Sequence, residues 1–191
     1  MWQRALALNP DNPRIYSNLG MAYQLERRYD NASQWLEKAI ALAPNSEVYW
    51  GNLAYARLFD PNLASRAPEA FQRAINLGER AVLSNPRDAN LHARLAEYWA
   101  ALGERNKSLS AIARAEALAK RSGYVQFRAA LVYELAGNRK RALRAVESAM
   151  EFGYSLEEIQ SSVPLNHLRD DLRYRKLLEK RMSTARNSCS L

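Results

Sequence analysis

Cysteine and histidine are almost absent from this 191-residue chain, which has one cysteine, Cys189, and two histidines, His92 and His167. A single cysteine excludes an internal disulfide and a cysteine-based zinc site. The sequence also lacks an HExxH pair, a glycine-rich phosphate loop and a Gly-x-Ser-x-Gly nucleophile motif. These absences predict a noncatalytic protein that holds no cofactor and no metal ion.

Long hydrophobic runs are missing as well, since no stretch approaches the ~18 apolar residues that a membrane-spanning helix requires. The N-terminal segment is interrupted at Asn9-Pro10, which is too early for a signal peptide. We therefore expect a soluble, cytoplasmic protein without membrane contact. With 48% hydrophobic residues, a chain of this length buries about 70% of its unfolded surface and needs no disulfide or metal to hold a core.

Positive charge is abundant but unevenly distributed along the chain. The formal net charge is +8, yet residues 1–100 carry 11 basic and 10 acidic side chains, whereas residues 101–191 carry 17 and 10. Only the C-terminal half is basic, which indicates either an acidic partner or nucleic acid at that end. The alternative is that these cations simply solvate exposed helix faces.

Glycine and proline are also scarce, with seven of each, so long segments are free to form helices. Residues 13–46 place large and small side chains at helical spacing in two groups, which are Tyr16, Leu19, Gly20 and Tyr23, then Ala32, Leu36 and Ala39, followed by Pro44. Each group lies on one face of a helix, and the small residues allow the two helices to approach closely. The pattern predicts a helical hairpin that ends near Pro44.

The same pattern recurs three more times with graded fidelity, at residues 47–88, 89–122 and 123–154, and the last copy is the weakest. The copy at 47–88 is 42 residues long, eight more than the first, and Arg57 stands in it where an aromatic residue is expected. The extra residues are expected to form a loop near residues 60–67, between two helices.

The 34-residue hairpin resembles the tetratricopeptide repeat (TPR) family, at every signature position in residues 13–46. This resemblance implies an all-α fold, a right-handed superhelix of antiparallel helical hairpins with a C-terminal capping helix. It further implies a noncatalytic protein-protein interaction scaffold, because the first helices of TPR arrays line a concave groove that takes extended peptides or helices.

The two ends of the chain depart from the repeat. Residues 1–12 match only the second helix of a truncated repeat, so we expect a longer protein to precede them. Residues 155–182 look like the capping segment that ends the TPR region of larger bacterial multidomain signalling proteins, such as Ser/Thr protein kinases or adenylate cyclases. Residues 183–191 are expected to be a disordered tail.

Candidate binding residues follow from the resemblance, which assigns certain positions of each first helix to the groove. One such position holds Asn18, Asn52, Arg94 and Arg128 in successive repeats. The resemblance implies that the asparagines pair with a peptide backbone and that the arginines bind a carboxylate, an acidic side chain or a phosphate. Other predicted peptide-binding residues are Arg14, Met21, Tyr55, Asn90, Glu97 and Phe127.

Each of these residues also has an interpretation that involves no ligand. Asparagine and arginine are common on any solvated helix surface, and Phe127 is equally suited to packing against the neighbouring hairpin. The chain also departs from TPR proteins that bind the C-terminal carboxylate of chaperones, because only Asn52 and Arg94 match their pattern. We therefore expect a protein or peptide partner that is not a chaperone terminus, with an acidic partner as one option.

Two other functions remain open from the sequence. The chain is suited to oligomerisation through an exposed repeat edge, for which the N-terminal half-repeat around Trp2 and Leu6 is the candidate. The basic C-terminal half is a candidate surface for nucleic acid, with clusters at residues 139–144 and 173–181. No aromatic residues interleave with these clusters, so nucleic acid is the weaker reading compared with an acidic protein surface or plain solvation.

Overall fold

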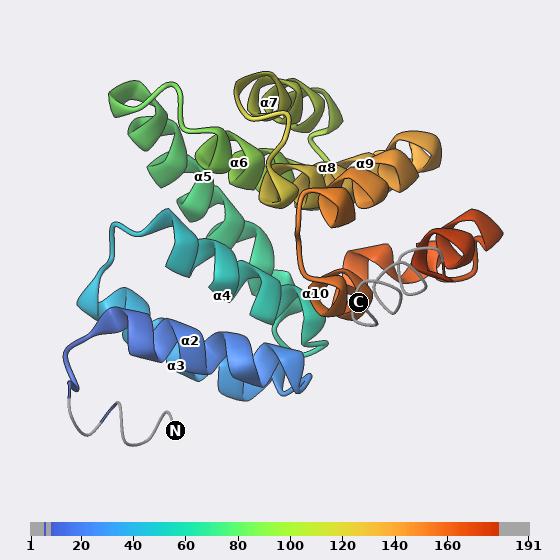
Figure 1. Ribbon diagram of the computed structural model, residues 1–191. Helices are drawn as coiled ribbons and strands as arrows, with labels where there is room; N and C mark the ends of the chain where they lie inside the picture. Colours follow the sequence, from blue (N-terminus) through green and yellow to red (C-terminus); the bar gives the residue numbers. More distant parts are fainter. Residues whose placement is uncertain (1–5, 7–8, 180–191) are drawn as a thin grey trace, which may run out of the picture. The chain divides into compact units, whose positions relative to one another are not determined.

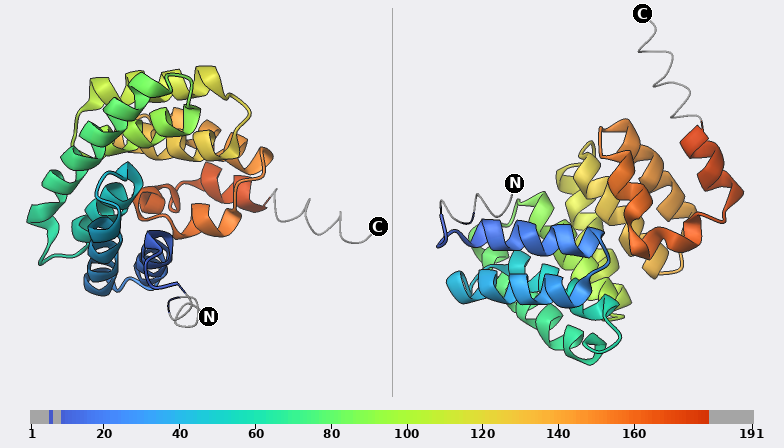
Figure 2. Two further views of the ribbon diagram at one scale, coloured as in Figure 1. Left: turned by 90° about the vertical axis from the view of Figure 1, so that its left-hand side faces the viewer. Right: turned by 90° about the horizontal axis from the view of Figure 1, so that it is seen from below.

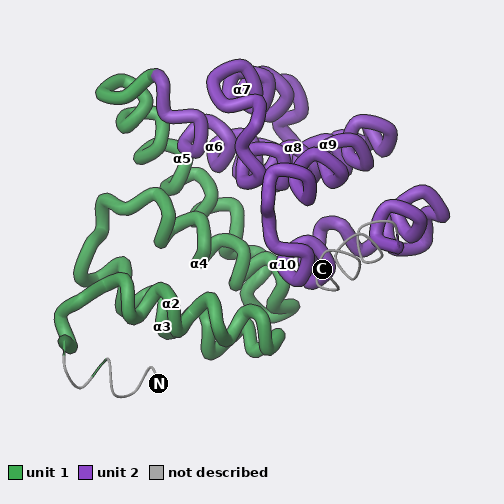
Figure 3. Tube along the Cα trace, in the orientation of Figure 1, with its two compact units in different colours: residues 1–86 green, residues 87–191 purple. Residues whose placement is uncertain are grey.

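The computed structural model describes residue 6 and residues 9–179, and all regular secondary structure among these residues is helical (Figure 1). The predicted all-α class is confirmed. The half-repeat expected over residues 1–12 and the tail expected over 183–191 lie mostly or wholly outside the described residues. The chain divides into two compact units, residues 1–86 and residues 87–191 (Figure 3).

The described part of unit 1, residue 6 and residues 9–86, contains two helical hairpins. The first joins α2 (Pro13–Leu25) to α3 (Tyr29–Leu42), which lie side by side in Figure 2, and the second joins α4 (Glu47–Phe59) to α5 (Ala67–Ser84). Local signals start these helices, because the side chain of Asn12 accepts a hydrogen bond from the Arg14 amide and that of Ser46 accepts one from the Tyr49 amide. Helix α4 packs against α3 and also contacts α2.

Close packing inside the first hairpin depends on small residues. A Cβ atom at Gly20 would lie 2.6 Å from Cγ of Leu36, so only glycine fits this backbone position without displacing the leucine. Leu36 is completely buried, and so are Ala32 and Ala39 on the same helix. The large–small pattern read from residues 13–46 therefore corresponds to real interhelical contact.

The longer second hairpin accommodates its extra residues after α4. Residues 61–63 form a turn, the short 3-10 helix η1 (Ala64–Arg66) follows, and α5 then runs for 18 residues with Pro68 in its first turn. Arg57, which replaces an expected aromatic residue, donates a 3.0 Å hydrogen bond to Glu37 on α3. An ion pair thus connects α4 to α3 at this position.

Unit 2 begins with two further hairpins. They are formed by α6 (Ala89–Ala101) with α7 (Arg105–Leu118), and by α8 (Gly123–Leu135) with α9 (Arg139–Glu151). Gly103 and Gly137 end α6 and α8 with positive φ angles of 77° and 73°, a conformation that favours glycine. Helix α8 packs against both α6 and α7 as well as its own partner α9.

The C-terminal capping segment is broken into three short helical pieces, where the sequence suggested one capping helix. These pieces are α10 (Leu156–Ser161), the 3-10 helix η2 (Val163–Leu168) and a helix at residues 172–179. Pro164 helps to explain the break, because proline has no backbone N–H and could not continue the hydrogen bonding of α10 through this position. Ile159, Leu165, Leu168 and Tyr174 are buried in the core of unit 2.

Asp171 begins the helix at residues 172–179. Its carboxylate accepts a hydrogen bond from the Arg173 amide at 2.9 Å and two from the Arg173 guanidinium at 2.7 and 3.0 Å. These bonds lower the pKa of Asp171 to about 2, and those from the Arg173 side chain have the largest effect. Because the pKa is lowered, the stabilisation is complete above the ordinary aspartate pKa of about 4 and is lost as pH falls towards 2.

We expect Arg173→Ala to return the pKa of Asp171 close to its ordinary value of about 4. The measurement is a carboxyl-carbon NMR titration of the folded chain between pH 2 and pH 6. Arg175→Ala is the control, because Arg175 pairs with Asp170 at 3.5 Å instead. An Asp171 pKa that stays near 2 in Arg173→Ala contradicts the assignment.

No helix in the part of the chain that the structure describes is both long enough and apolar enough to cross a membrane.

Candidate functional site

The first helices of unit 1, α2 and α4, contact one another and present one face that carries predicted binding residues. Asn18 and Arg14 on α2 are exposed, and Met21 on the same helix is 47% exposed. Asn52 on α4 is half-buried. We call this surface, defined by Arg14, Asn18, Met21 and Asn52, the α2–α4 face.

Side-chain hydrogen bonds tie α2 to α4 along this face. Gln24 donates from Nε2 to the backbone oxygen of Asn52 at 2.7 Å, and Asn52 donates from Nδ2 to Oγ of Ser17 at 3.4 Å. The amide of Asn52 is therefore oriented by α2. Within the described residues, its Oδ1 atom and the side-chain amide of Asn18 form no hydrogen bond, so both offer unused polar atoms.

Tyr55, also predicted to bind a ligand, contributes mainly to packing within unit 1. Its ring stacks on Phe59 with centroids 6.0 Å apart and meets the buried Phe71 edge-on at 5.0 Å. The half-buried ring thus joins α4 to α5. Met21 is the predicted apolar binding residue that unit 1 leaves exposed.

In unit 2, the predicted arginine Arg128 already has an internal carboxylate partner. Its guanidinium forms an ion pair with Glu97, whose side chain is 4% exposed, while the side chain of Arg128 is 23% exposed. Glu97, predicted to line the groove, instead lies inside unit 2 between α6 and α8. Burial raises the pKa of the neighbouring Tyr98 above its ordinary value, and the charge of Arg128 opposes that shift.

Phe127 is also directed into unit 2 and is 7% exposed. Its ring stacks on Tyr154 at 4.4 Å between centroids, with an angle of 14° between the planes. Phe127 thus packs inside unit 2, as the alternative to peptide binding predicted. Arg128 lies over the ring of Tyr124 at 5.0 Å and near that of Phe127 at 5.8 Å, which places its cation on aromatic faces.

Tyr154, which follows α9, covers the ring of Phe127, and η2 also packs against α8. Tyr124, Phe127 and Leu131 follow one another at helical spacing on α8, and this apolar run is the signal that would have indicated a covered face. The remaining predicted residues of unit 2 are Asn90, which is exposed, and Arg94, which is half-buried. Unit 2 thus presents few free groups at the predicted positions, whereas unit 1 presents several.

No cluster of three or more His, Cys, Asp or Glu side chains suited to a metal ion occurs in the described ranges.

Comparison with known proteins agrees with the geometry of the hairpins. The family model of the tetratricopeptide repeat matches residues 13–46. A thermophilic TPR protein of Thermus thermophilus, known from its crystal structure, superimposes with a TM-score of 0.61 at 22% identity, over 93% of this chain and 87% of that chain. The fold is that of a TPR protein.

Two further solved structures resemble the chain less closely. MamA superimposes with a TM-score of 0.45 at 22% identity, over 79% of this chain and 84% of its own. YrrB, described as a TPR protein with an unusual peptide-binding site, gives a TM-score of 0.40 at 15% identity, over 83% and 95%. No curated protein sequence matches the chain. The TPR assignment therefore rests on residues 13–46 and on the fold.

Proposed function

We propose that this TPR chain is a noncatalytic protein-interaction module whose α2–α4 face binds an extended peptide segment of a partner protein. The observation that carries the proposal is the pair of carboxamides on neighbouring first helices. Asn18 is exposed with its amide unused, and Asn52 keeps a free Oδ1 atom while Ser17 orients its amide group. Pre-oriented groups lose less freedom on binding than mobile ones do.

A carboxamide suits recognition of a peptide backbone because it both donates and accepts hydrogen bonds. It pairs with the amide and carbonyl of any residue, so the sequence of the partner is constrained by other contacts. Exposed Arg14 offers a charge-assisted bond to an acidic side chain, and Met21 offers a flexible apolar contact. Each neutral hydrogen bond contributes about 0.5–1.5 kcal/mol, and the bond from Arg14 contributes about 1.5–3 kcal/mol.

The site is centred on unit 1 because Glu97 and Arg128, two of the charged candidates in unit 2, already pair with each other. Glu97 neutralises Arg128, and η2 packs against α8. The resemblance of the C-terminal segment to the ends of bacterial signalling proteins supports a place for this module in a larger regulatory protein.

The test uses a phage-displayed library of random 12-residue peptides, selected on the whole chain. The best peptide is then titrated by calorimetry into the parent and into Asn18→Ala/Asn52→Ala. We expect binding to weaken at least about fivefold in this variant, from the loss of two or three hydrogen bonds at about 0.5–1.5 kcal/mol each.

The matched control is Asn76→Ala/Asn106→Ala, which removes two exposed asparagines from second helices, α5 and α7. It is expected to bind like the parent. Equal affinity of the parent and the Asn18→Ala/Asn52→Ala variant for the selected peptide would show that the α2–α4 face is not the site.

A further inference from the structure

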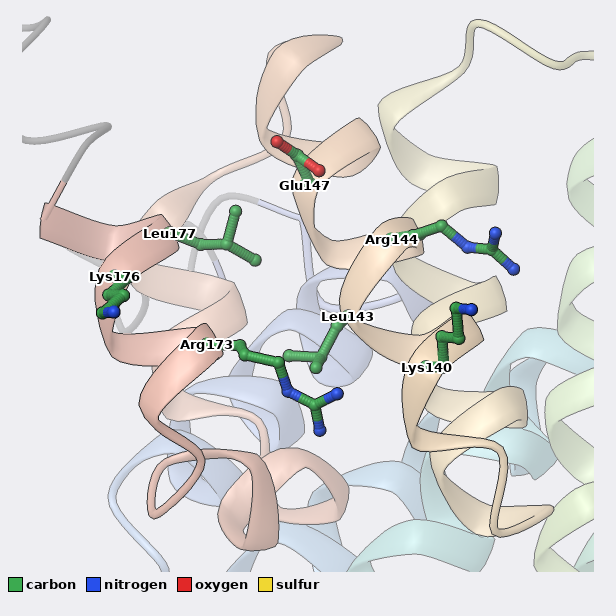
Figure 4. A pocket seen from close by; sticks show the side chains of 7 residues that line it. All are labelled: Lys140, Leu143, Arg144, Glu147, Arg173, Lys176 and Leu177. Atoms are coloured by element: carbon green, nitrogen blue, oxygen red, sulfur yellow. The ribbon is translucent and has the colours of Figure 1, made fainter.

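A cleft of about 430 Å³ lies in unit 2 between α9 and the helix at residues 172–179 (Figure 4). Leu143 and Leu177 extend into the space between the two helices, and Arg173 lies beside them. Lys140 and Arg144 form the outer rim on α9, and Lys176 forms the rim on the other helix. We call this site, defined by these six residues, the basic cleft. Its volume is within the ~300–1,000 Å³ typical of ligand sites.

The charges of the basic cleft are unbalanced. Arg173 is paired with Asp171 at 2.7 Å. Lys140, Arg144 and Lys176 have no carboxylate within 4.0 Å anywhere in the described ranges, and Glu147 is the sole acidic side chain that lines the cleft. Three unpaired cations against one carboxylate create a positive potential that attracts an anionic group.

The apolar residues at the bottom of the basic cleft, its floor, indicate which kind of anionic ligand fits. Leu143 is 6% exposed and Leu177 is half-buried, so the space between the helices is lined by hydrocarbon. No aromatic side chain lines the cleft, and single-stranded nucleic acid depends on aromatic rings for base stacking. An apolar side chain fits the floor better than a sugar or a phosphate does.

The sequence of residues 180–191 is unsuited to fill the basic cleft. Residues 180–191 contain Lys180, Arg181 and Arg186 and no aspartate or glutamate. Their positive charge opposes that of the rim. The occupant that the charges and the floor favour is therefore an acidic segment from another protein.

We propose that the basic cleft binds an acidic, leucine-bearing segment of a partner protein, at a site separate from the α2–α4 face. A short amphipathic helix satisfies both requirements, because its leucines line one face and its glutamates flank them. The leucines contact Leu143 and Leu177, and the carboxylates accept hydrogen bonds from Arg144 on one rim and Lys176 on the other. Second helices and capping segments thus become part of the interaction surface.

The test measures fluorescence anisotropy of labelled probes with the whole chain at 0.15 M salt. The first probe is a 12-residue peptide of glutamate and leucine, with leucine at i, i+3, i+4 and i+7. In the second, every leucine is replaced by serine, which keeps the charge. The third is a 12-nucleotide oligothymidylate. We expect the first probe to bind at least tenfold more tightly than either of the others.

Two variants locate the site. Arg144→Glu/Lys176→Glu is expected to weaken binding of the first probe at least tenfold, because both rims change sign, and Leu177→Ser is expected to weaken it severalfold. The matched control, Arg114→Glu/Lys120→Glu, makes the same charge change at exposed positions outside the cleft and is expected to alter binding less than twofold. Circular dichroism and thermal melting verify that each variant folds.

Several results would overturn the proposal. Equal binding of the serine peptide or the oligonucleotide identifies a general polyanion surface, and equal loss in the control variant identifies an effect of net charge. If sedimentation shows that the parent dimerises and Arg144→Glu/Lys176→Glu does not, the cleft is an interface between two copies of this chain. The Asn18→Ala/Asn52→Ala variant should bind the first probe normally, which separates this site from the α2–α4 face.

Discussion

Glu97→Ala is expected to lower the free energy of unfolding of unit 2 by about 3 kcal/mol. The Glu97 carboxylate pairs with Arg128 inside unit 2, and Glu97→Ala removes that carboxylate from a guanidinium in a largely buried position. Breaking a buried ion pair typically costs about 3–5 kcal/mol, and the lower end applies because the side chain of Arg128 is 23% exposed. Urea denaturation followed by circular dichroism measures the change.

A double-mutant cycle separates the ion pair from the packing of each side chain. Arg128→Ala alone should also destabilise, because it leaves Glu97 buried without its cation. The double variant Glu97→Ala/Arg128→Ala should cost less than the two single changes added together, by about 1–3 kcal/mol. Strictly additive single effects would contradict the coupling.

This prediction affects how binding experiments at Arg128 are interpreted. Its substitution changes the stability of unit 2 whether or not a ligand is present, so lost binding in such a variant does not identify a contact residue. Asn18 and Asn52 are better probes, because one is exposed and the other is half-buried with a single 3.4 Å side-chain hydrogen bond.

The second large effect is expected at Leu36, the completely buried leucine that faces Gly20. Leu36→Ala should lower the free energy of unfolding of unit 1 by about 3 kcal/mol, since it leaves a cavity between α2 and α3. Leu25→Ala is the matched control, because Leu25 is 73% exposed and should change stability by less than about 0.5 kcal/mol. Hydrogen exchange of α3 amides in the folded chain reports the change for unit 1 separately from unit 2.

Gly20 offers a sharper version of the same test. Gly20→Ala places a Cβ atom 2.6 Å from Cγ of Leu36 and should cost about 1–3 kcal/mol through overpacking. In the double variant Gly20→Ala/Leu36→Ala, the added methyl group occupies space that the leucine vacates. The double variant should therefore lose less free energy of unfolding than the two single variants lose together. A loss equal to or greater than their sum would show that Gly20 and Leu36 do not share this space.

Local spacing in the sequence was sufficient to predict the hairpin at residues 13–46, and the resemblance of that hairpin to the TPR family implied the all-α class. Helices repeat every 3.6 residues, so the faces formed by Leu19 and Gly20 and by Ala32 and Leu36 are visible without any three-dimensional information. Helix starts at Ser46 and Asp88 are equally local, because a cap contacts only the next turn.

The environment of the candidate site residues was decided by tertiary structure. Asn18 and Arg128 occupy the same position of their repeats, yet Asn18 is exposed whereas Arg128 pairs with Glu97, which lies 31 residues away in the sequence. Phe127 is covered by Tyr154 in the same manner. Repeat position indicates which face of a helix a side chain occupies, but it contains no information on what later packs against that face.

The basic cleft is a second feature that the sequence alone did not predict. Sequence reasoning located two clusters of cations and favoured solvated helix faces for them. Lys140 and Lys176 are brought to one cleft only because η2 packs against α8 and Ile159, Leu165 and Leu168 are buried in the core of unit 2. Secondary structure depends on neighbours within a few residues, whereas a binding surface depends on which distant segments exclude water from one another, and that was settled by the tertiary fold.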